Sequence, residues 1–362
     1  TGTRNTAVGA LCLDSNTTAD RNTAVGYDAL STTTTGGNNV AVGSFAQKLL
    51  TTGTRNVSVG DAALNGNQTG TDNTSIGDQT LKVNTASNNT VVGSHAMFAN
   101  TTGDENVAVG KDALDANTTA GGNSALGYAS LTSNTTGAKN TAVGNSSLFN
   151  NTTADSNTSI GWSTMGANTT GANNTAVGKS AMLDNTTGGL NTAVGVQALS
   201  NNTTASENTA VGVNALLTNT TGAANTASGY LALTVNTTGS SNAAFGKDSL
   251  GANTTGNANV AVGKDALKAN TTADNNTAVG IDALTANTTG HSNVAIGANA
   301  LLTSTTRLGN TAVGFNAAKV TDTTGIVAVG YKAMEANTTG YDAVAVGASS
   351  LLANTTGHSN TA

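Results

Sequence analysis

The strongest constraint on the fold is a short motif that repeats along the whole chain. The motif is Asn-Thr-Ala-Val-Gly, and its terminal glycine recurs 21 times between Gly9 and Gly347. Eighteen of the twenty intervals between these glycines are 17 residues long, and two are 16. Because loops in globular folds vary in length between copies, a spacing this regular indicates that every repeat forms the same structural unit.

Apolar residues recur at fixed positions of the repeat, counted from the glycine as position 0. Position −1 is apolar in 20 copies, and position +4 is Leu or Met in 19. We predict that both rows are interior, so that a Val194→Asp substitution would bury an unpaired charge and destabilise the fold strongly. The rows are represented by Val8, Val25 and Val194 at −1, and by Leu30, Leu199 and Leu284 at +4.

The charged residues show which parts of the repeat face solvent. The chain has 14 Lys and Arg and 20 Asp and Glu, and all but Arg307 and Asp322 lie at positions +1, +2, +5 or +6 or at the two positions before the motif. These three charged stations predict three exposed corners. The short segments between them are rich in Thr and Val and contain two glycines per repeat, which favours strands over helices.

These patterns predict an all-β fold, a parallel β-solenoid or β-roll with one 17-residue repeat per coil and about 21 coils. Only 3% of the residues are aromatic, so the interior must be thin. We expect residues 1–362 to form a single continuous array and to be a segment of a longer protein. Asn recurs at positions −4 and +7, and stacked Asn side chains form hydrogen-bonded ladders, represented by Asn5, Asn22, Asn117 and Asn191.

Neither face of the expected strand carries a charge in any copy. Side chains alternate along a strand, so positions −3 and −1 share one face while −2 and 0 share the other. A strand that is buried on both sides needs a second covering layer, and an identical chain would supply it in a symmetric bundle, for which we expect a trimer. The alternative is that Ala and Gly line a narrow wall that faces solvent.

The unit Asn-Thr-Ala-Val-Gly-x-x-Ala-Leu resembles the head repeats of trimeric autotransporter adhesins. It is also similar to the repeats of bacterial and phage proteins described as tail-fibre-like. Residues 22–35 and 276–290 carry the resemblance best, and it covers essentially the whole chain. It implies a left-handed parallel β-roll that is trimeric and is displayed outside the cell or on a virion as a spacer or adhesin.

Residues that could carry chemistry are few and far apart. His95, His291 and His358 fall at corner positions four or more repeats apart, which predicts no shared metal site in one chain. Cys12 is the only cysteine, which excludes an internal disulfide framework, and it occupies the row of small residues at +3, where we expect it to replace a buried Ala. We therefore expect no catalytic residues, no cofactor and no metal.

Two surface features are candidates for binding. Aromatic residues recur at position +1, a corner suited to stacking on sugars or on a partner; scattered surface decoration is the alternative. The Thr pairs, such as Thr118 and Thr119, form a regular wall of the kind that orders water in ice-binding solenoids, although only one residue of each adjacent pair can face outward. The candidate aromatic contacts are Tyr27, Tyr128, Trp162, Tyr230 and Tyr331.

The expected function is that of a non-enzymatic fibre segment, an extracellular or virion-borne spacer or adhesin shaft. Expected partners are further copies of the chain, as a homotrimer or an end-to-end filament, and a host-surface glycan or protein. A net charge of −6 gives no basic footprint for nucleic acid, and no segment is apolar over a membrane-spanning length. The alternative is a solenoid that uses its surface to bind carbohydrate or ice.

Overall fold

The structure is a computed structural model that describes residues 2–362. The chain divides into two compact units, Thr1–Ser180 and Ala181–Ala362. Within residues 2–362, the only regular secondary structure is a series of three-residue strands, one from every repeat, and no helix occurs.

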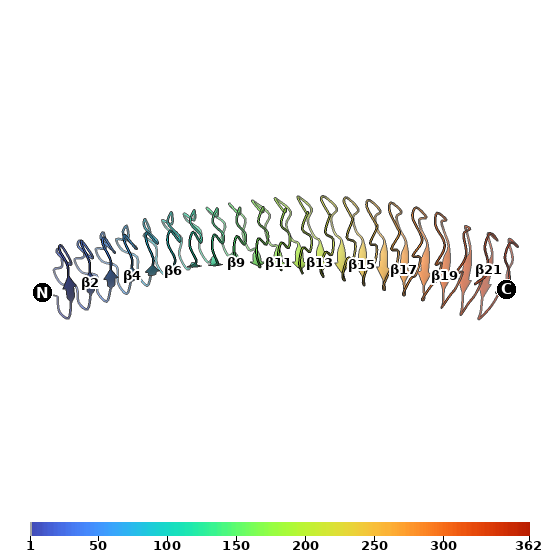
Figure 1. Cartoon of the computed structure of the whole chain (residues 1–362), viewed down its shortest axis with the longest axis horizontal. Coiled ribbons are helices and arrows are strands. Elements are labelled where there is room, and N and C mark those ends of the chain that lie inside the picture. The colour runs from blue at the N-terminus through green and yellow to red at the C-terminus, as the bar shows by residue number, and fades with distance from the viewer. Residues whose placement is uncertain (1) are drawn as a thin grey trace. The chain divides into compact units, whose positions relative to one another are not determined.

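The first unit stacks its strands in parallel, each beside the strand of the next repeat (Figure 1). The pairing is in register: Thr6 lies opposite Thr23, and each following residue lies opposite its counterpart one repeat later. The strands are β1 (Thr6–Val8), β2 (Thr23–Val25), β3 (Val40–Val42), β4 (Val57–Val59), β5 (Thr74–Ile76), β6 (Thr90–Val92), β7 (Val107–Val109), β8 (Ser124–Leu126), β9 (Thr141–Val143), β10 (Thr158–Ile160) and β11 (Thr175–Val177).

The second unit has the same arrangement. Its consecutive strands also pair in parallel and in register. The strands are β12 (Thr192–Val194), β13 (Thr209–Val211), β14 (Thr226–Ser228), β15 (Ala243–Phe245), β16 (Val260–Val262), β17 (Thr277–Val279), β18 (Val294–Ile296), β19 (Thr311–Val313), β20 (Val327–Val329) and β21 (Val344–Val346). The predicted parallel β-solenoid with one repeat per coil is confirmed.

Hydrogen bonds between coils continue outside the strands. Leu199 N donates to Ala215 O at 2.9 Å, and Thr101 N donates to Thr118 O at 2.8 Å, each bond joining one coil to the next. The two 16-residue repeats keep the strand register, since Thr74 pairs with Thr90 and Thr311 with Val327. The missing residue is therefore absorbed between the strands, and the backbone ladder is kept around the coil.

The corners require an unusual backbone. Positions +2, +4 and +12 adopt left-handed φ angles, as at Asp28 (63°), Leu30 (50°) and Asn38 (61°). Gly26, at position 0, has a φ of 134°, and a Cβ there would lie 2.4 Å from the carbonyl oxygen of Gly43 in the next coil. The glycine row is therefore fixed by both conformation and space. The left-handed Leu row was not expected from the sequence.

The interior rows differ from the prediction at position −1. Val8 is 57% exposed, Val194 is 37% exposed and Val25 is half-buried, whereas Ala24 and Ala193 at position −2 are fully buried. Strand alternation places −2 and 0 inward, where the thin interior accepts Ala and Gly, and turns the bulkier Val outward. The assignment of Val8, Val25 and Val194 to the core was therefore wrong.

The Leu row is interior as expected. Leu30, Leu199 and Leu284 are fully buried opposite the Ala row. The third repeat exchanges two positions: Gln47 replaces Leu at +4 and Leu50 replaces Asn at +7, and both are fully buried. Gln47 Nε2 donates to the Ser58 hydroxyl at 2.9 Å, so a polar pair and a displaced leucine fill the same interior.

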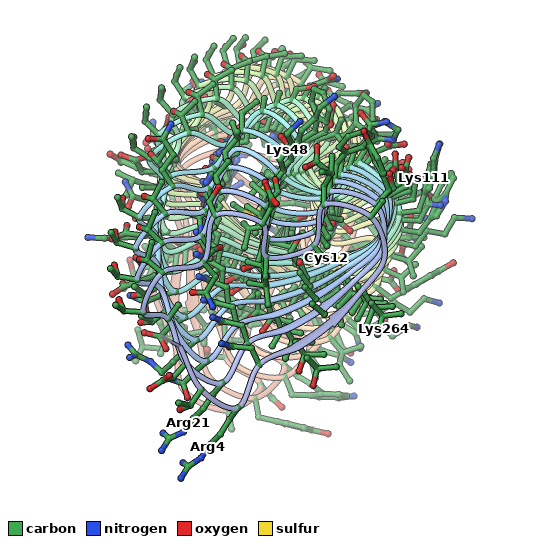
Figure 2. All side chains as sticks on the ribbon, turned by 90° about the vertical axis from the view of Figure 1, so that its left-hand side faces the viewer. Arg4, Cys12, Arg21, Lys48, Lys111 and Lys264 are labelled. Atoms are coloured by element: carbon green, nitrogen blue, oxygen red, sulfur yellow. The ribbon has the colours of Figure 1, made fainter. Side chains whose placement is uncertain are left out.

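The charged corners of the first unit point away from each other. Seen along this unit, Arg4 and Arg21 project from one corner and Lys111 from another, while Lys48 lies apart from both (Figure 2). Cys12 lies among the inner side chains in the same view. The spacing of charges along the repeat thus indicates the solvent-facing corners of this unit, although Asp28 at position +2 is buried.

Candidate functional site

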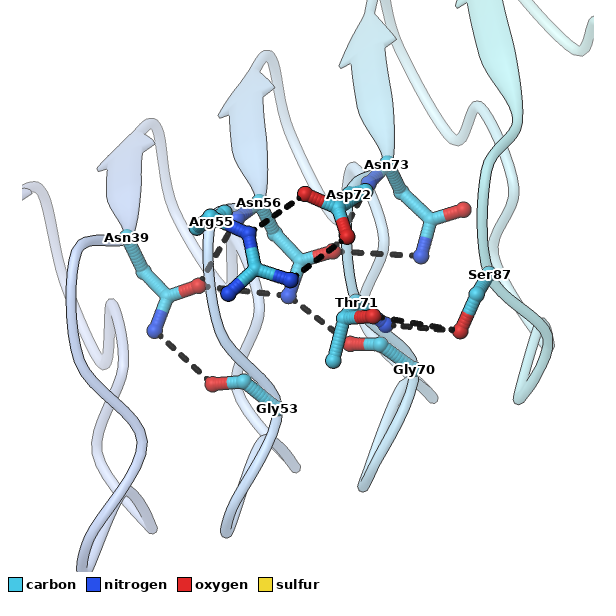
Figure 3. A network of polar contacts seen from close by, with 9 residues as sticks. All are labelled: Asn39, Gly53, Arg55, Asn56, Gly70, Thr71, Asp72, Asn73 and Ser87. Atoms are coloured by element: carbon cyan, nitrogen blue, oxygen red, sulfur yellow. Dashed lines mark hydrogen bonds and ion pairs between the residues drawn. The ribbon is translucent and has the colours of Figure 1, made fainter.

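Asparagines at position −4 form the first of two buried ladders. Asn56 N donates to Asn39 Oδ1 at 2.9 Å, and Asn56 Nδ2 donates to Gly70 O at 2.9 Å (Figure 3). The predicted members behave in the same way, because Asn22 N donates to Asn5 Oδ1 at 2.8 Å. Asn191 Oδ1 likewise accepts from Asn208 N at 2.9 Å. The asparagine side chains therefore provide hydrogen-bond partners for backbone N–H and C=O groups at a corner of the coil.

A second ladder runs along position +7. Asn117 Nδ2 donates to Asn100 Oδ1 at 2.8 Å and to Ala120 O of its own coil at 3.0 Å. Asn117 is fully buried, and its side chain is committed to these bonds. The many Asn-Thr-Thr glycosylation sequons of the repeat place their acceptor nitrogen in this ladder, which removes it from solvent in the folded chain.

The +7 ladder is interrupted where the sequence changes. Asn287 is followed one coil later by Ser304, which has no amide to donate. Asn287 Oδ1 and Ser304 Oγ are both buried without a hydrogen-bond partner within residues 2–362. Each asparagine oxygen in the ladder therefore needs an asparagine at the same position of the next coil to donate a hydrogen bond to it.

The outward side of the strands forms an uncharged apolar surface in each unit. We call the residues at positions −3 and −1 the outer strand face; it contains Thr, Val, Ile and similar residues and no charged residue in any copy. Its −1 members are partly or largely exposed in the single chain. In the first unit these include Val59, Ile76, Leu126 and Ile160, and in the second Val194, Val211, Phe245, Val262 and Ile296.

The five predicted aromatic contacts all lie on the surface, between 50% and 54% exposed. The structure does not gather them into one cluster; each lies at its own coil directly after the glycine. Most instead lie beside another side chain: Lys111 lies over Tyr128 at 5.9 Å, Lys179 over Trp162 at 5.4 Å and Lys247 over Tyr230 at 6.0 Å.

Sequence reasoning missed these lysine partners, although a signal was present. Lys111, Lys179 and Lys247 occupy the same repeat position as the rings, one repeat away. Rows of equivalent residues stack in a solenoid, so an aromatic residue and a lysine at equal positions of adjacent repeats must lie side by side.

Ion pairs cover the same corner. Asp265 accepts from Lys268 at 2.9 Å and lies 3.1 Å from Lys264. Burial raises the pKa of Asp265, but hydrogen bonds from Lys268 and Lys264 outweigh it and hold the pKa below its usual value. Asp115 has no such lysine, and its pKa is raised by burial and by the neighbouring Asp112.

The Thr pairs divide between interior and solvent. Thr118 is half-buried and its hydroxyl donates to Thr135 O at 3.0 Å, whereas Thr119 is exposed. The expectation that one residue of each adjacent pair faces outward is confirmed at this coil. The outward hydroxyls therefore form a single row per unit.

The cysteine and the histidines, the remaining candidates for catalysis or metal binding, do not come together in a site. Cys12 is half-buried and its Sγ donates to Gly26 O at 2.7 Å. His95 and His291 lie at corner positions, each beside a serine hydroxyl. No group of three or more His, Cys, Asp or Glu side chains suited to a metal ion occurs in the part of the chain the structure describes.

Comparison with known proteins identifies no relative of the chain. No protein-family model matches the chain, and no curated protein shows significant similarity to it. Residues 2–362 also contain no helix with the length and apolarity needed to span a membrane.

Proposed function

We propose that the chain is a non-enzymatic structural fibre segment, displayed outside a cell or on a virion as a spacer or adhesin shaft. The observation that carries the proposal is the in-register stacking of nearly identical coils in each unit, in which backbone bonds join successive coils and two Asn ladders run through most of them. Such a stack gains stability with each added coil, which suits a load-bearing spacer.

The outer strand face is the proposed contact between chains. An exposed, uncharged surface with a row of apolar residues along it is typical of an interaction site, and a repeat presents the same surface at each coil. Three copies joined by this face form the homotrimer, and end-to-end stacking into a filament is a further mode of self-association.

The test is the molar mass of the purified chain in light scattering, with paired variants. Wild type is expected at three times the 35.3 kDa chain mass. A double variant Val194→Asp, Val211→Asp places charges on the outer strand face and should be monomeric. The control Thr204→Asp, Thr221→Asp places the same charges on the exposed Thr row and should remain a trimer. A monomeric wild type contradicts the proposal.

An ice-binding surface is the second candidate. The observation in its favour is the row of exposed Thr side chains at position +9, as at Thr187, Thr204 and Thr221. The measurement is thermal hysteresis of the wild type and of Thr204→Lys. Hysteresis that the substitution abolishes would replace the spacer proposal, and its absence would reject ice binding.

A further inference from the structure

Five successive coils of the first unit carry a distinctive series at position +1, directly after the glycine of each strand. The series, which we call the aromatic row, is Lys111, Tyr128, Asn145, Trp162 and Lys179. The strands of these coils, β7 to β11, pair in register, so the five residues stack in one line. At about 4.8 Å per coil, the row extends about 19 Å.

The two rings of the aromatic row are covered on their outer sides only. Lys111 belongs to the coil before Tyr128 and lies over its ring at 5.9 Å, and Lys179 belongs to the coil after Trp162 and lies over its ring at 5.4 Å. Tyr128 and Trp162 are therefore separated by two coil steps, about 9.6 Å, with only Asn145 between them. Both rings are more than half exposed.

The space between the rings contains a polar group. Asn145 is exposed, and its Oδ1 accepts from the Ser146 hydroxyl at 2.8 Å, which leaves its amide N–H groups to donate outward. Aromatic ring faces and an amide donor are groups that recognise a sugar ring.

The charge around the aromatic row is positive in an acidic protein. The chain has a net charge of −6, yet the four coils of β8 to β11 have no Asp or Glu between positions −3 and +2. Lys179 forms no ion pair within residues 2–362, and Lys111 pairs with Asp112 at 3.2 Å. A ligand that spans the row therefore meets an unpaired cation, Lys179, at one end and Lys111, which pairs with Asp112, at the other.

We propose that the aromatic row binds a linear anionic polysaccharide built from uronic acid units. Its pyranose rings stack on Tyr128 and Trp162, Asn145 donates to a ring hydroxyl, and Lys111 and Lys179 pair with the carboxylates. This site rests on the proposed display of the chain outside a cell or virion, where such polysaccharides occur.

The chain has one tryptophan, so its fluorescence reports on this site alone. The experiment titrates the full chain with polygalacturonate at low salt, with dextran as the neutral control. We expect a saturable change in Trp162 emission with polygalacturonate only. Tyr128→Ala keeps the reporter and should weaken binding about tenfold, and Lys179→Gln about threefold. The matched variant Tyr230→Ala, an exposed ring of the second unit, should bind as wild type.

Three results would overturn the site: no response to polygalacturonate, an equal response to dextran, or binding that Tyr128→Ala leaves unchanged. Calorimetry of Trp162→Ala gives a second measurement without the reporter, and it should show the same loss as Tyr128→Ala. Light scattering on the same samples separates the two proposals. A trimer that does not bind overturns the polysaccharide site alone, whereas a monomer that binds overturns the trimer and leaves the site standing.

Discussion

The residue that distinguishes this fold from an ordinary β protein is the buried asparagine. Asn202 Nδ2 donates to Asn185 Oδ1 at 2.8 Å and to Ala205 O at 2.9 Å, and its Oδ1 accepts from Asn219 Nδ2 at 3.0 Å. The interior is only an Ala row and a Leu row thick, so polar groups at the corners lie close to it and must be satisfied by side chains of the chain itself.

Replacing one ladder asparagine should therefore be costly. Asn202→Ala removes three hydrogen bonds at a fully buried position, and we expect a loss of about 2–4 kcal/mol in the free energy of unfolding. The adjacent Asn201 is exposed and serves as a matched control, since Asn201→Ala should change stability little. Denaturant unfolding followed by circular dichroism measures both; equal effects would contradict the ladder's role.

An ion pair between a buried carboxylate and a partly exposed lysine makes the stability of the fold depend on pH. Asp28 is buried and lies 2.7 Å from Lys48 Nζ, and hydrogen bonds from Lys48 and then Ser31 hold the pKa of Asp28 below its usual value. A carboxyl whose pKa is lower in the folded chain than in the unfolded chain stabilises the folded state at pH values above its unfolded pKa, which is near 4. This stabilisation is lost as the pH falls through the folded-state pKa.

The Asp28→Asn variant should therefore melt at a lower temperature than wild type at pH 6, and the difference should shrink as the pH falls below about 4. Thermal melts between pH 6 and pH 2.5 measure this convergence. Asp61→Asn, which changes the same charge at an exposed position, is the control and should track wild type. A difference that stays constant with pH would show that the Asp28 carboxylate does not contribute in this way.

At the scale of the element, three residues decide what each strand does. The middle residue of β12, Ala193, is fully buried, and the last, Val194, is 37% exposed. Side chains alternate along a strand, so the small residue enters the thin interior and the large one remains on the outer strand face. An apolar residue in a short strand is thus no guarantee of burial within one chain.

Aspartate at these two neighbouring positions should have different effects. Ala193→Asp places an unpaired charge in the interior and should cost at least about 3 kcal/mol in the free energy of unfolding. Val194→Asp should leave the fold of the chain intact, because its carboxylate reaches solvent, and should instead weaken association between chains. Circular dichroism at a concentration where the chain is monomeric compares the two, and similar destabilisation would place Val194 in the interior after all.

At the scale of the whole molecule, the chain behaves as a sum of coils. Within each unit, a strand pairs only with the strands one repeat before or after it, and the shorter repeats show that register is kept by adjustment between strands. Stability in such a stack is set by each coil and its neighbours, so whole coils are interchangeable.

Deleting residues 196–212 removes one complete 17-residue coil and joins two equivalent positions. The product should fold with unchanged strand content and a slightly lower melting temperature. Deleting residues 196–204 removes about half a coil, brings unlike positions into one row and should abolish cooperative unfolding. The two deletions are compared by circular dichroism and thermal melting. If both fold equally well, the coil is not the structural unit.

The repeat by itself determined the parallel solenoid with one repeat per coil, the Leu row and the two Asn ladders, because identical residues at a fixed spacing must stack upon themselves. It did not determine how much of the coil is strand: the short segments between the three corners were expected to be strands, and only the three residues before each glycine form one. It did not determine which side of the strand is inside: Val8 and Val194 are the larger apolar residues, yet only the tertiary structure shows that the opposite wall leaves space for Ala and Gly alone. The left-handed backbone at Leu30 and the lysines over Tyr128 and Trp162 were likewise decided in three dimensions, since the path of the corners sets which side chains of adjacent coils meet.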